Sequence, residues 1–381
     1  MKKILVFVFP FLTIAACKDP YDPGISYPST GYLVMEGFVN SGAGATDIRL
    51  SRTVKTSDSA RLSYEANADM LVEGDDGSVY VIPWQTEGRY YTENLHLNDA
   101  HQYRLRIRTA DGREYLSDYN KVIRTPPIDS ISYYRTADGV HINLNTHDPG
   151  NNTQYYTWQT DETWEIQSRY LPNVTYRYDS QLRPIGIEYI FPDGRYDYSG
   201  YTCWRTEAST KILLGSTIKL DEDKLTREIA FIEEGSWKLD VKYSIHVVMH
   251  GRTPEGFDFL QRMAKNSEQV GTIFDAQPSE LNSNLHSTTN PDEPVIGFVE
   301  FADRQEQRIF IRKTDVAPWV YEPECEDKEI PIIPKELMDA YIQSYVPIVF
   351  TSPFNTSVQV ASQSCTDCRM RGTNIMPPFW Q

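Results

Sequence analysis

The sequence is poor in positive charge, in cysteine and in histidine. It carries 37 lysines and arginines against 53 aspartates and glutamates, which gives a formal net charge of −16 at pH 7. A chain with this balance is repelled by phosphate backbones, so we expect no nucleic-acid partner. Hydrophobic residues make up 40% of the chain, as in ordinary globular proteins, which argues against an intrinsically disordered chain and predicts a sizeable core.

Recognisable catalytic motifs are also missing. The sequence has no Gly-x-Ser-x-Gly, no His-Glu-x-x-His, no phosphate loop and no dinucleotide fingerprint. His246 and His250 alternate with their neighbours as in a strand, which would place them about 13 Å apart, too far to share a metal ion. We interpret both as surface or half-buried side chains. Asp148 and Asp223 lie in acidic turns without the spaced ligands of a calcium loop. We therefore expect no enzyme, no metal site and no cofactor, with a hydrolase using an unrecognised carboxylate pair as the weakest alternative.

The N-terminal residues hold the longest apolar stretch. Lys2 and Lys3 precede apolar residues 4–16, a run too short to span a bilayer and typical of a signal peptide. Ile14-Ala-Ala-Cys17 resembles the lipobox of signal peptidase II, which predicts cleavage after residue 16 and lipid on Cys17. Loss of the two lysines would take the net charge to −18. We expect residues 17–31 to form a lipidated tether to a membrane, because several acyl chains anchor a protein stably.

The residues that follow Cys17 bear on which membrane holds the anchor. Lys18 stands where an inner-membrane retention signal would place aspartate. Lys18-Asp19, with Asp22 nearby, looks like a shortened form of the basic-then-acidic export signals of Bacteroidota surface lipoproteins. We expect an outer-membrane location, with the cell surface favoured over the periplasmic face; both faces stay open.

Four cysteines follow the lipidation site: Cys203, Cys325, Cys365 and Cys368. An even number in an oxidising compartment predicts two disulfides, with three connectivities open. Cys365-Thr-Asp-Cys368 is a CxxC motif, but the glycine and prolines that follow cannot build the helix of a thioredoxin-type redox pair. A zinc site would require further cysteines or histidines nearby. We expect structural disulfides that hold the C-terminal tail against the body.

Short strands separated by turns dominate the mature chain. In residues 32–125, Tyr103, Leu105 and Ile107 alternate with arginines, and Gly74-Asp-Asp-Gly77 predicts a hairpin turn. About seven such strands favour an Ig-like β-sandwich. Thr125-Pro-Pro127 predicts an extended linker, and residues 126–381 then predict a larger β-rich C-terminal domain with disulfides.

The sequence contains two helical patterns, and both lie within residues 126–381. Thr253 followed by Pro254, with Phe257 and Leu260 on one face, predicts a helix that ends near Gly271. A shorter helix is expected from Pro334 to Tyr345. The sequence thus predicts a mainly β protein with one or two short helices.

The most unusual segment is aromatic. Residues 155–204 hold nine of the 25 tyrosines, many of them among the arginines, prolines and glycines of loops. Aromatic side chains with a polar tip suit contacts with proteins, peptides or sugars, although tyrosine also simply fills strands. The candidate contact surface comprises Tyr170, Tyr176, Tyr178, Tyr189, Tyr196, Tyr198, Tyr201 and Trp204.

Taken together, four stretches of the chain resemble the domain-of-unknown-function 4249 family of Bacteroidota lipoproteins. They are Tyr32-Leu-Val-Met-Glu-Gly37, Thr125-Pro-Pro-Ile-Asp-Ser-Ile131, Ile273-Phe-Asp-Ala-Gln-Pro278 leading to Pro294-Val-Ile-Gly-Phe298, and Cys365-Thr-Asp-Cys-Arg369 with Gly372-Thr373 and Pro378-Phe-Trp380. Ser283 departs from the family pattern, which has a glycine before the asparagine.

Members of this family are often encoded beside TonB-dependent outer-membrane transporters. The resemblance therefore implies a non-catalytic accessory or ligand-binding partner of such a transporter in nutrient uptake, with an unknown small ligand, glycan or peptide. The family has no established reaction, so the resemblance implies no catalytic residue. A structural or adhesion-type surface lipoprotein is the alternative.

Overall fold

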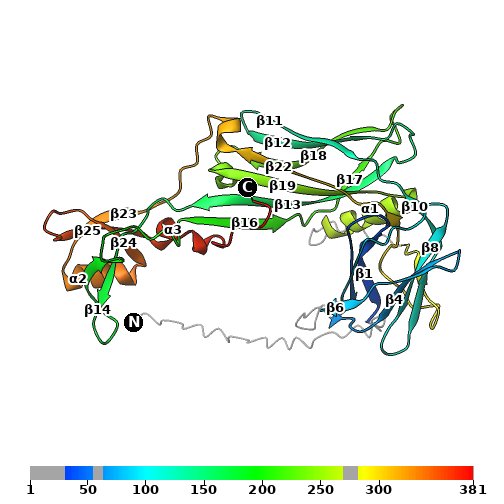
Figure 1. Cartoon of the computed structure of the whole chain (residues 1–381), viewed down its shortest axis with the longest axis horizontal. Helices are drawn as coiled ribbons and strands as arrows, with labels where there is room; N and C mark the ends of the chain where they lie inside the picture. Colours follow the sequence, from blue (N-terminus) through cyan, green and yellow to red (C-terminus); the bar gives the residue numbers. More distant parts are fainter. Residues whose placement is uncertain (1–30, 55–62, 269–281, 381) are drawn as a thin grey trace, which may run out of the picture.

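The protein is mainly β, as expected, and its shape is elongated (Figure 1). A computed structural model describes residues 31–54, 63–268 and 282–380. An N-terminal unit occupies one end, a sandwich of long strands the middle, and a distal lobe the other end (Figure 1). The predicted signal peptide, Cys17 and the tether up to residue 30 lie outside the described residues. Within the described part, no helix has both the length and the apolar character needed to cross a bilayer.

The N-terminal unit is one extended sheet whose strands curl around a common core. Its strands are β1 (Leu33–Asn40), β2 (Ala45–Arg52), β3 (Ser63–Tyr64), β4 (Asp69–Gly74), β5 (Val79–Val81), β6 (Trp84–Thr86), β7 (Arg89–Glu93), β8 (Gln102–Arg108), β9 (Glu114–Ser117), β10 (Asn120–Ile123), β20 (Leu285–Ser287) and β21 (Phe301–Ala302). Alternation decides which side chains are buried: Tyr103, Leu105 and Ile107 on β8 face the core. The Tyr103 hydroxyl accepts a hydrogen bond from the Asn98 amide at 3.0 Å, which fixes the approach to this strand.

Two late strands complete this N-terminal sheet. β20 pairs with β9, and β21 runs parallel to both β1 and β10. Residues from beyond the expected boundary at residue 125 are therefore part of the first core, to which Leu285 and Phe301 contribute. With this topology the predicted Ig-like sandwich is not confirmed.

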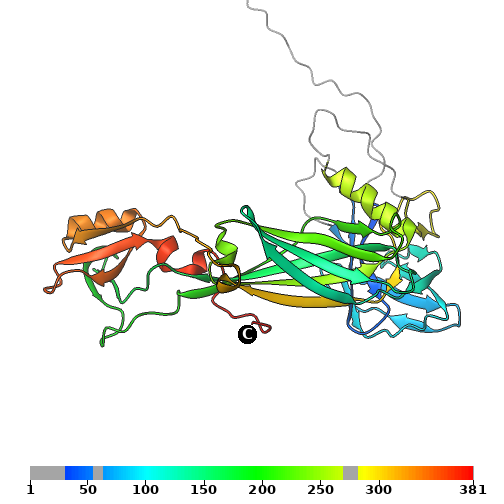
Figure 2. The ribbon, with the colours of Figure 1, turned by 90° about the horizontal axis from the view of Figure 1, so that it is seen from above.

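The central sandwich packs two antiparallel sheets face to face, with its strands along the long axis of the molecule (Figure 2). One sheet contains β11 (Ile128–Arg135), β12 (Gly139–His147) and β18 (Lys224–Glu233); the other contains β13 (Tyr155–Gln167), β16 (Thr202–Ala208), β17 (Leu213–Ser216), β19 (Lys242–Gly251) and β22 (Gln305–Arg312). On β12, Val140, Ile142 and Leu144 point into the core while the intervening polar residues face outward. β13 is paired on both edges, and its side chains Tyr156, Trp158, Trp164 and Ile166 are buried in the sandwich core.

The distal lobe grows from the far end of β13 and β16. It contains β14 (Val174–Tyr178), β15 (Pro184–Tyr189), β23 (Asp327–Pro331), β24 (Tyr345–Phe350), β25 (Ser357–Ser362), α2 (Pro334–Ile342) and α3 (Gln363–Thr366). Val174, Leu337 and Val358 belong to its small core. The helix predicted from Pro334 ends earlier than expected, at Ile342, because Ser344 takes a positive φ and the chain enters β24 at Tyr345.

The helix α1 (Pro254–Glu268) confirms the predicted start. The Thr253 hydroxyl accepts from the Gly256 amide at 3.0 Å, the N-cap bond that its position suggests. The predicted end at Gly271 lies outside the described residues. α1 packs beside the junction of the N-terminal unit and the central sandwich, the region that contains the cavity described next (Figure 1).

Candidate binding cavity

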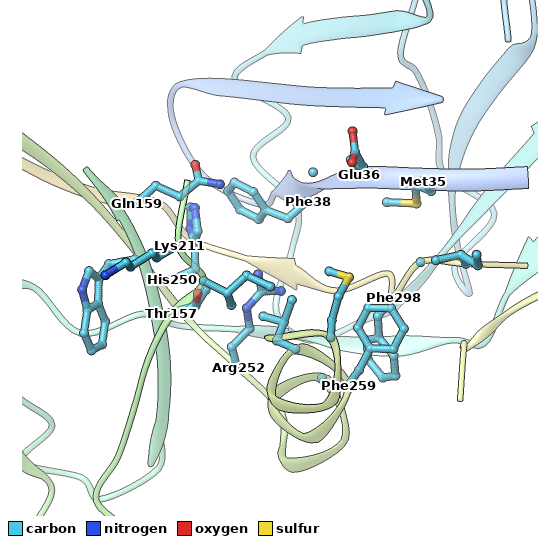
Figure 3. Close-up of a pocket in the computed structure, with 18 of the residues that line it drawn as sticks. Met35, Glu36, Phe38, Thr157, Gln159, Lys211, His250, Arg252, Phe259 and Phe298 are labelled. Carbon is cyan, nitrogen blue, oxygen red and sulfur yellow. The ribbon is translucent and has the colours of Figure 1, made fainter. Parts of the chain in front are cut away.

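A cavity of about 410 Å³ lies between β1 of the N-terminal unit, β13 and β19 of the central sandwich, and α1. This volume falls in the range of small-molecule sites, about 300–1,000 Å³. The loop of residues 209–212 and the segment 296–298 complete its walls. Figure 3 shows the polar side chains of Gln159, Lys211 and His250 toward one side of the cavity and Phe259 and Phe298 toward the other.

The apolar side is built from elements distant in sequence. Phe259 on α1 packs against Phe298, with ring centroids 5.6 Å apart. Met35 reaches this side from β1, and Gly297 allows the close approach, because a Cβ there would lie 3.0 Å from Met35 Cβ. Met263 from the next turn of α1 also lines the cavity. Methionine and phenylalanine side chains form an adaptable apolar wall.

His250, at the end of β19, is the most unusual group in the cavity wall. It is only 4% exposed, and its ring lies 3.5 Å from that of Phe38, measured between centroids. Burial lowers the pKa of His250 well below its ordinary value of 6.5, and the charges of Arg252 and Arg304 lower it further. The imidazole is therefore neutral at pH 7. It hydrogen-bonds the backbone of Asp303, whereas Nδ1 is buried without a partner among the described residues.

Arg252 supplies a second buried polar group. Its Nη1 donates to Glu300 Oε2 at 2.5 Å, and the Glu300 side chain is 1% exposed. The same carboxylate accepts from the Thr253 amide and hydroxyl, at 2.8 and 2.7 Å, at the start of α1. The charge of Arg252 is thus neutralised by Glu300, yet Arg252 Nε is buried with no partner in the described part of the chain.

Three further polar residues of the lining, Glu36, Gln159 and Lys211, are exposed. Thr157 is buried and donates its hydroxyl hydrogen to the Leu213 carbonyl at 3.0 Å. Of the carboxylates that the structure describes, none forms an ion pair with Lys211. Within residues 31–54, 63–268 and 282–380, no group of histidine, cysteine, aspartate or glutamate side chains is placed to hold a metal ion. The cavity therefore offers hydrogen-bonding groups beside an apolar wall, an arrangement suited to binding.

The predicted tyrosine surface is distributed over several environments in and near the distal lobe. Tyr178, Tyr189, Tyr196 and Tyr198 are exposed, by 41 to 65%. Tyr176 instead belongs to the core of the lobe, and its ring meets that of Tyr341. The remaining members are held by specific partners: Tyr170 by Asp327, Tyr201 by Tyr198, and Trp204 by Trp380.

The disulfides resolve the connectivity that the sequence left open. Cys203 on β16 is bonded to Cys368, and Cys325 to Cys365. The two cysteines of the CxxC motif therefore have different partners. The tail beyond them returns to the central sandwich, where Trp380 packs on Phe310. The expected attachment of the C-terminal tail to the body is confirmed.

The histidine interpretation needs one correction. His246 is partly exposed beside Asp161 and Glu306, as expected, but His250 is fully buried and not a surface or half-buried residue. The alternation of β19 puts both on the face opposite the sandwich core, and at His250 that face is covered by the N-terminal unit. The residues around His250 in the sequence give no sign that the N-terminal unit covers it, since Phe38 is more than 200 residues away.

Two carboxylates of the acidic turns accept hydrogen bonds within the protein. Asp148 accepts backbone hydrogen bonds from Gly150, Asn152 and Thr153, and the buried Asp223 carboxylate accepts from the hydroxyls of Tyr156 and Thr217. These carboxylate oxygens are already engaged within the protein.

Two comparisons bear on the whole chain. The model of the family described as domain of unknown function (DUF4249) matches residues 18–308. The matched range contains β1, β13, β19, α1 and the segment 296–298, and so all the walls of the cavity. It stops before the terminal cysteine motif. No protein with a curated description matches the chain.

Proposed function

The chain belongs to the DUF4249 family, and from that premise we propose that it is a non-catalytic lipoprotein, anchored through Cys17, that binds a ligand for a TonB-dependent outer-membrane transporter. The cavity between β1, β19 and α1 is the proposed ligand site. The proposed location is the outer membrane, with the body on the cell surface.

The position of the cavity supports this proposal. β1 begins at Leu33, and its residues 34–38 line the cavity. The sixteen residue-to-residue steps from Cys17 to Leu33 span at most about 55 Å when fully extended. A lipid on Cys17 would therefore keep the cavity within that distance of the membrane, where a transporter takes up its substrate.

The wall of the cavity supports binding without chemistry. Its histidine is neutral, packed against Phe38 and held by a backbone hydrogen bond. Glu300, outside the lining, is engaged by Arg252 and the start of α1, and Glu36, the carboxylate in the lining, is exposed. Neither His250 nor Glu300 is placed as an activated base beside a nucleophile. Binding is the function that these groups support best.

A structural or adhesion-type surface lipoprotein is the second candidate. It is favoured by the apolar side chains that the distal lobe exposes, among them Leu182, Ile342 and Phe354, which are 71 to 86% exposed. Exposed apolar side chains gathered at one end of an elongated molecule suit a contact surface.

Co-purification tests the proposal. The lipidated protein, tagged at its C-terminus and expressed at native abundance, should be isolated with a large outer-membrane barrel in mild detergent. The matched control is Cys17→Ser, which removes the lipid and should release the protein from the membrane fraction. Isolation of the wild-type lipoprotein without a barrel would reject the transporter partnership. An unmodified thiol at Cys17 by mass spectrometry would reject the anchor.

A further inference from the structure

We propose that the turn of the β14–β15 hairpin, in the distal lobe, is a second membrane contact that enters the surface of the bilayer in which Cys17 is anchored. This inference goes beyond the transporter partnership and rests on one part of the proposed function, the lipid anchor. It follows from an exposed leucine in a strained conformation, from the side chains around that leucine, and from the direction in which the hairpin points.

Leu182 is the most unusual residue of the hairpin. It is 75% exposed, and its φ of +58° lies in the left-handed region that favours glycine and asparagine. Among the eight non-glycine residues with positive φ in the described part of the chain, Leu182 is the only one with an apolar side chain. Neither the turn nor a core accounts for a leucine at this position. A contact outside the protein would account for it.

The backbone of the turn is satisfied by its own hydrogen bonds. The Asp179 carboxylate accepts from the amides of Gln181 and Arg183, both at 2.9 Å. The Leu182 amide donates to the Asp179 carbonyl at 3.1 Å, and the Asp179 amide donates to the Arg183 carbonyl at 3.0 Å. Backbone groups without partners are costly in a lipid environment. Leu182 can therefore meet acyl chains without carrying unsatisfied amides with it.

Aromatic and aliphatic side chains lie next to the turn. Tyr178, which precedes it, is 41% exposed, and its ring centroid lies 5.9 Å from that of Tyr341. Tyr341 and Ile342 end α2 and are 44% and 71% exposed. Tyrosine, with an apolar ring and a polar tip, is enriched where lipid meets water, and leucine and isoleucine favour the acyl chains. This combination fits the boundary of a bilayer.

The charges near the turn also fit a lipid surface. Residues 177–183 carry two arginines and one aspartate, a net charge of +1 in a chain whose net charge is −16. Arg183 is paired with Asp179 at 2.7 Å, and both carboxylates of α2 lie within ion-pair distance of Lys335. Arg177 is exposed and has no carboxylate partner among the residues that the structure describes. Glu188 lies at the other end of the hairpin, so Arg177 is free to meet a lipid phosphate.

The hairpin points to the side of the molecule from which the tether leaves. β1 runs from Leu33 toward the central sandwich, where Phe38 packs against His250, so its start faces away from the sandwich. The start of β1 and the turn between β14 and β15 lie at the same lower edge in Figure 1, and so does β6, whose Trp84 is 39% exposed. A membrane at this edge would meet both ends of the molecule. The anchor would keep the hairpin close to it, so that even a weak contact is populated.

Fluorescence quenching by lipid tests the contact. We would place an environment-sensitive fluorophore on Gln181→Cys in the lipidated full-length protein. The protein would be reconstituted in nanodiscs of phosphatidylethanolamine and phosphatidylglycerol that carry spin-labelled acyl chains. The label in the turn should be quenched. Phe354→Cys is the matched control, because residue 354 is 86% exposed but lies in the turn between β24 and β25, away from the lower edge (Figure 1). Its label should stay unquenched.

Leu182→Asn removes the apolar side chain without threatening the fold. Asparagine adopts positive φ readily, so the thermal unfolding midpoint should not fall. The equilibrium constant for lipid contact, read from the quenching at residue 181, should fall about tenfold because the leucine no longer leaves water. Phe354→Asn should leave the quenching at residue 181 unchanged.

Three results would overturn the lipid contact: no quenching at residue 181, equal quenching at residues 181 and 354, or quenching at residue 181 that Leu182→Asn does not change. Protection of the label at residue 181 only when an outer-membrane barrel is reconstituted with the protein would replace the lipid by a protein partner. Failure of the anchor is seen separately. A protein with an unmodified thiol at Cys17 would not enter the nanodiscs and would reject the anchor together with this contact, whereas an incorporated but unquenched protein rejects the contact alone.

Discussion

The buried carboxylate of Glu300 is the strongest single test of how the junction beside α1 is held. Glu300→Gln preserves the shape of the side chain and removes its charge. Oε1 can still accept from Thr253, whose amide and hydroxyl lie 2.8 and 2.7 Å away. The new amide group would instead face the Nη1 donor of Arg252, which now lies 2.5 Å from Oε2.

The expected loss follows from burial. The side chains of Glu300 and Arg252 are 1% and 12% exposed, so the substitution leaves a largely buried cation without its partner. Removing one partner of a buried ion pair costs about 3–5 kcal/mol. Because both bonds to Thr253 survive, we expect a value near the lower end, about 3 kcal/mol. Because a neutral amide oxygen would replace a charged acceptor in both bonds to Thr253, the first turn of α1 should also lose some protection against hydrogen exchange.

Urea denaturation followed by circular dichroism would measure the change in free energy, and hydrogen exchange of the α1 amides would locate it. Asp258→Asn is the matched control: it removes a carboxylate from the same helix, where the ion pair with Arg262 is exposed and worth about 0.5 kcal/mol. If the two variants were equally stable, the argument that burial makes Glu300 a major stabilising contact would be wrong.

Because the pKa of His250 is lowered in the folded protein, the unfolded chain binds a proton below pH 6.5 that the folded chain excludes. The free energy of unfolding should therefore fall by about 1.4 kcal/mol per pH unit as the pH drops below 6.5. Urea denaturation at a series of pH values would measure this fall, and His250→Phe should remove it. Trp380→Ala should cost about 3 kcal/mol in thermal or urea unfolding, because the ring packs on Phe310 and is 7% exposed, whereas Phe354→Ala, at an 86% exposed site, should cost almost nothing. Replacing the Cys203–Cys368 pair by serines should destabilise the protein about 1 kcal/mol more than replacing Cys325–Cys365, because the sequence separations are 165 and 40; equal losses would argue against a chain-entropy origin.

Local features of the fold were predictable because their causes are local. The alternation around Tyr103 produced a strand with one buried face, and Thr253-Pro254 placed the start of α1 correctly. The pairing of the cysteines was not predictable, because Cys365 and Cys368 lie in the same short motif. Only the tertiary fold decides which distant cysteine each of them meets. The late strands of the N-terminal sheet escaped notice for a related reason: β21 has only two residues, too few for a periodic pattern.

The cavity could not be found from the sequence. Its walls come from β1, β13, β19, α1 and two connecting segments, spread over residues 34–298. Two of its polar residues, His250 and Arg252, look ordinary in the sequence, and only the fold brings Phe38 and Glu300 against them. Tertiary packing, and no motif, creates the site.

The nested arrangement of the disulfides has a mechanical consequence. The bond between Cys203 and Cys368 closes a loop that also contains Cys325 and Cys365. A force that pulls the two chain ends apart would pass from β16 directly to residue 368, bypassing everything between them. About 165 residues, or roughly 550 Å of contour length, would be shielded from stretching until the bond is reduced. The elements of the distal lobe inside this loop, β23, β24, β25, α2 and α3, would thus bear no load, whereas β14 and β15 precede Cys203 and would lie in the part of the chain under tension.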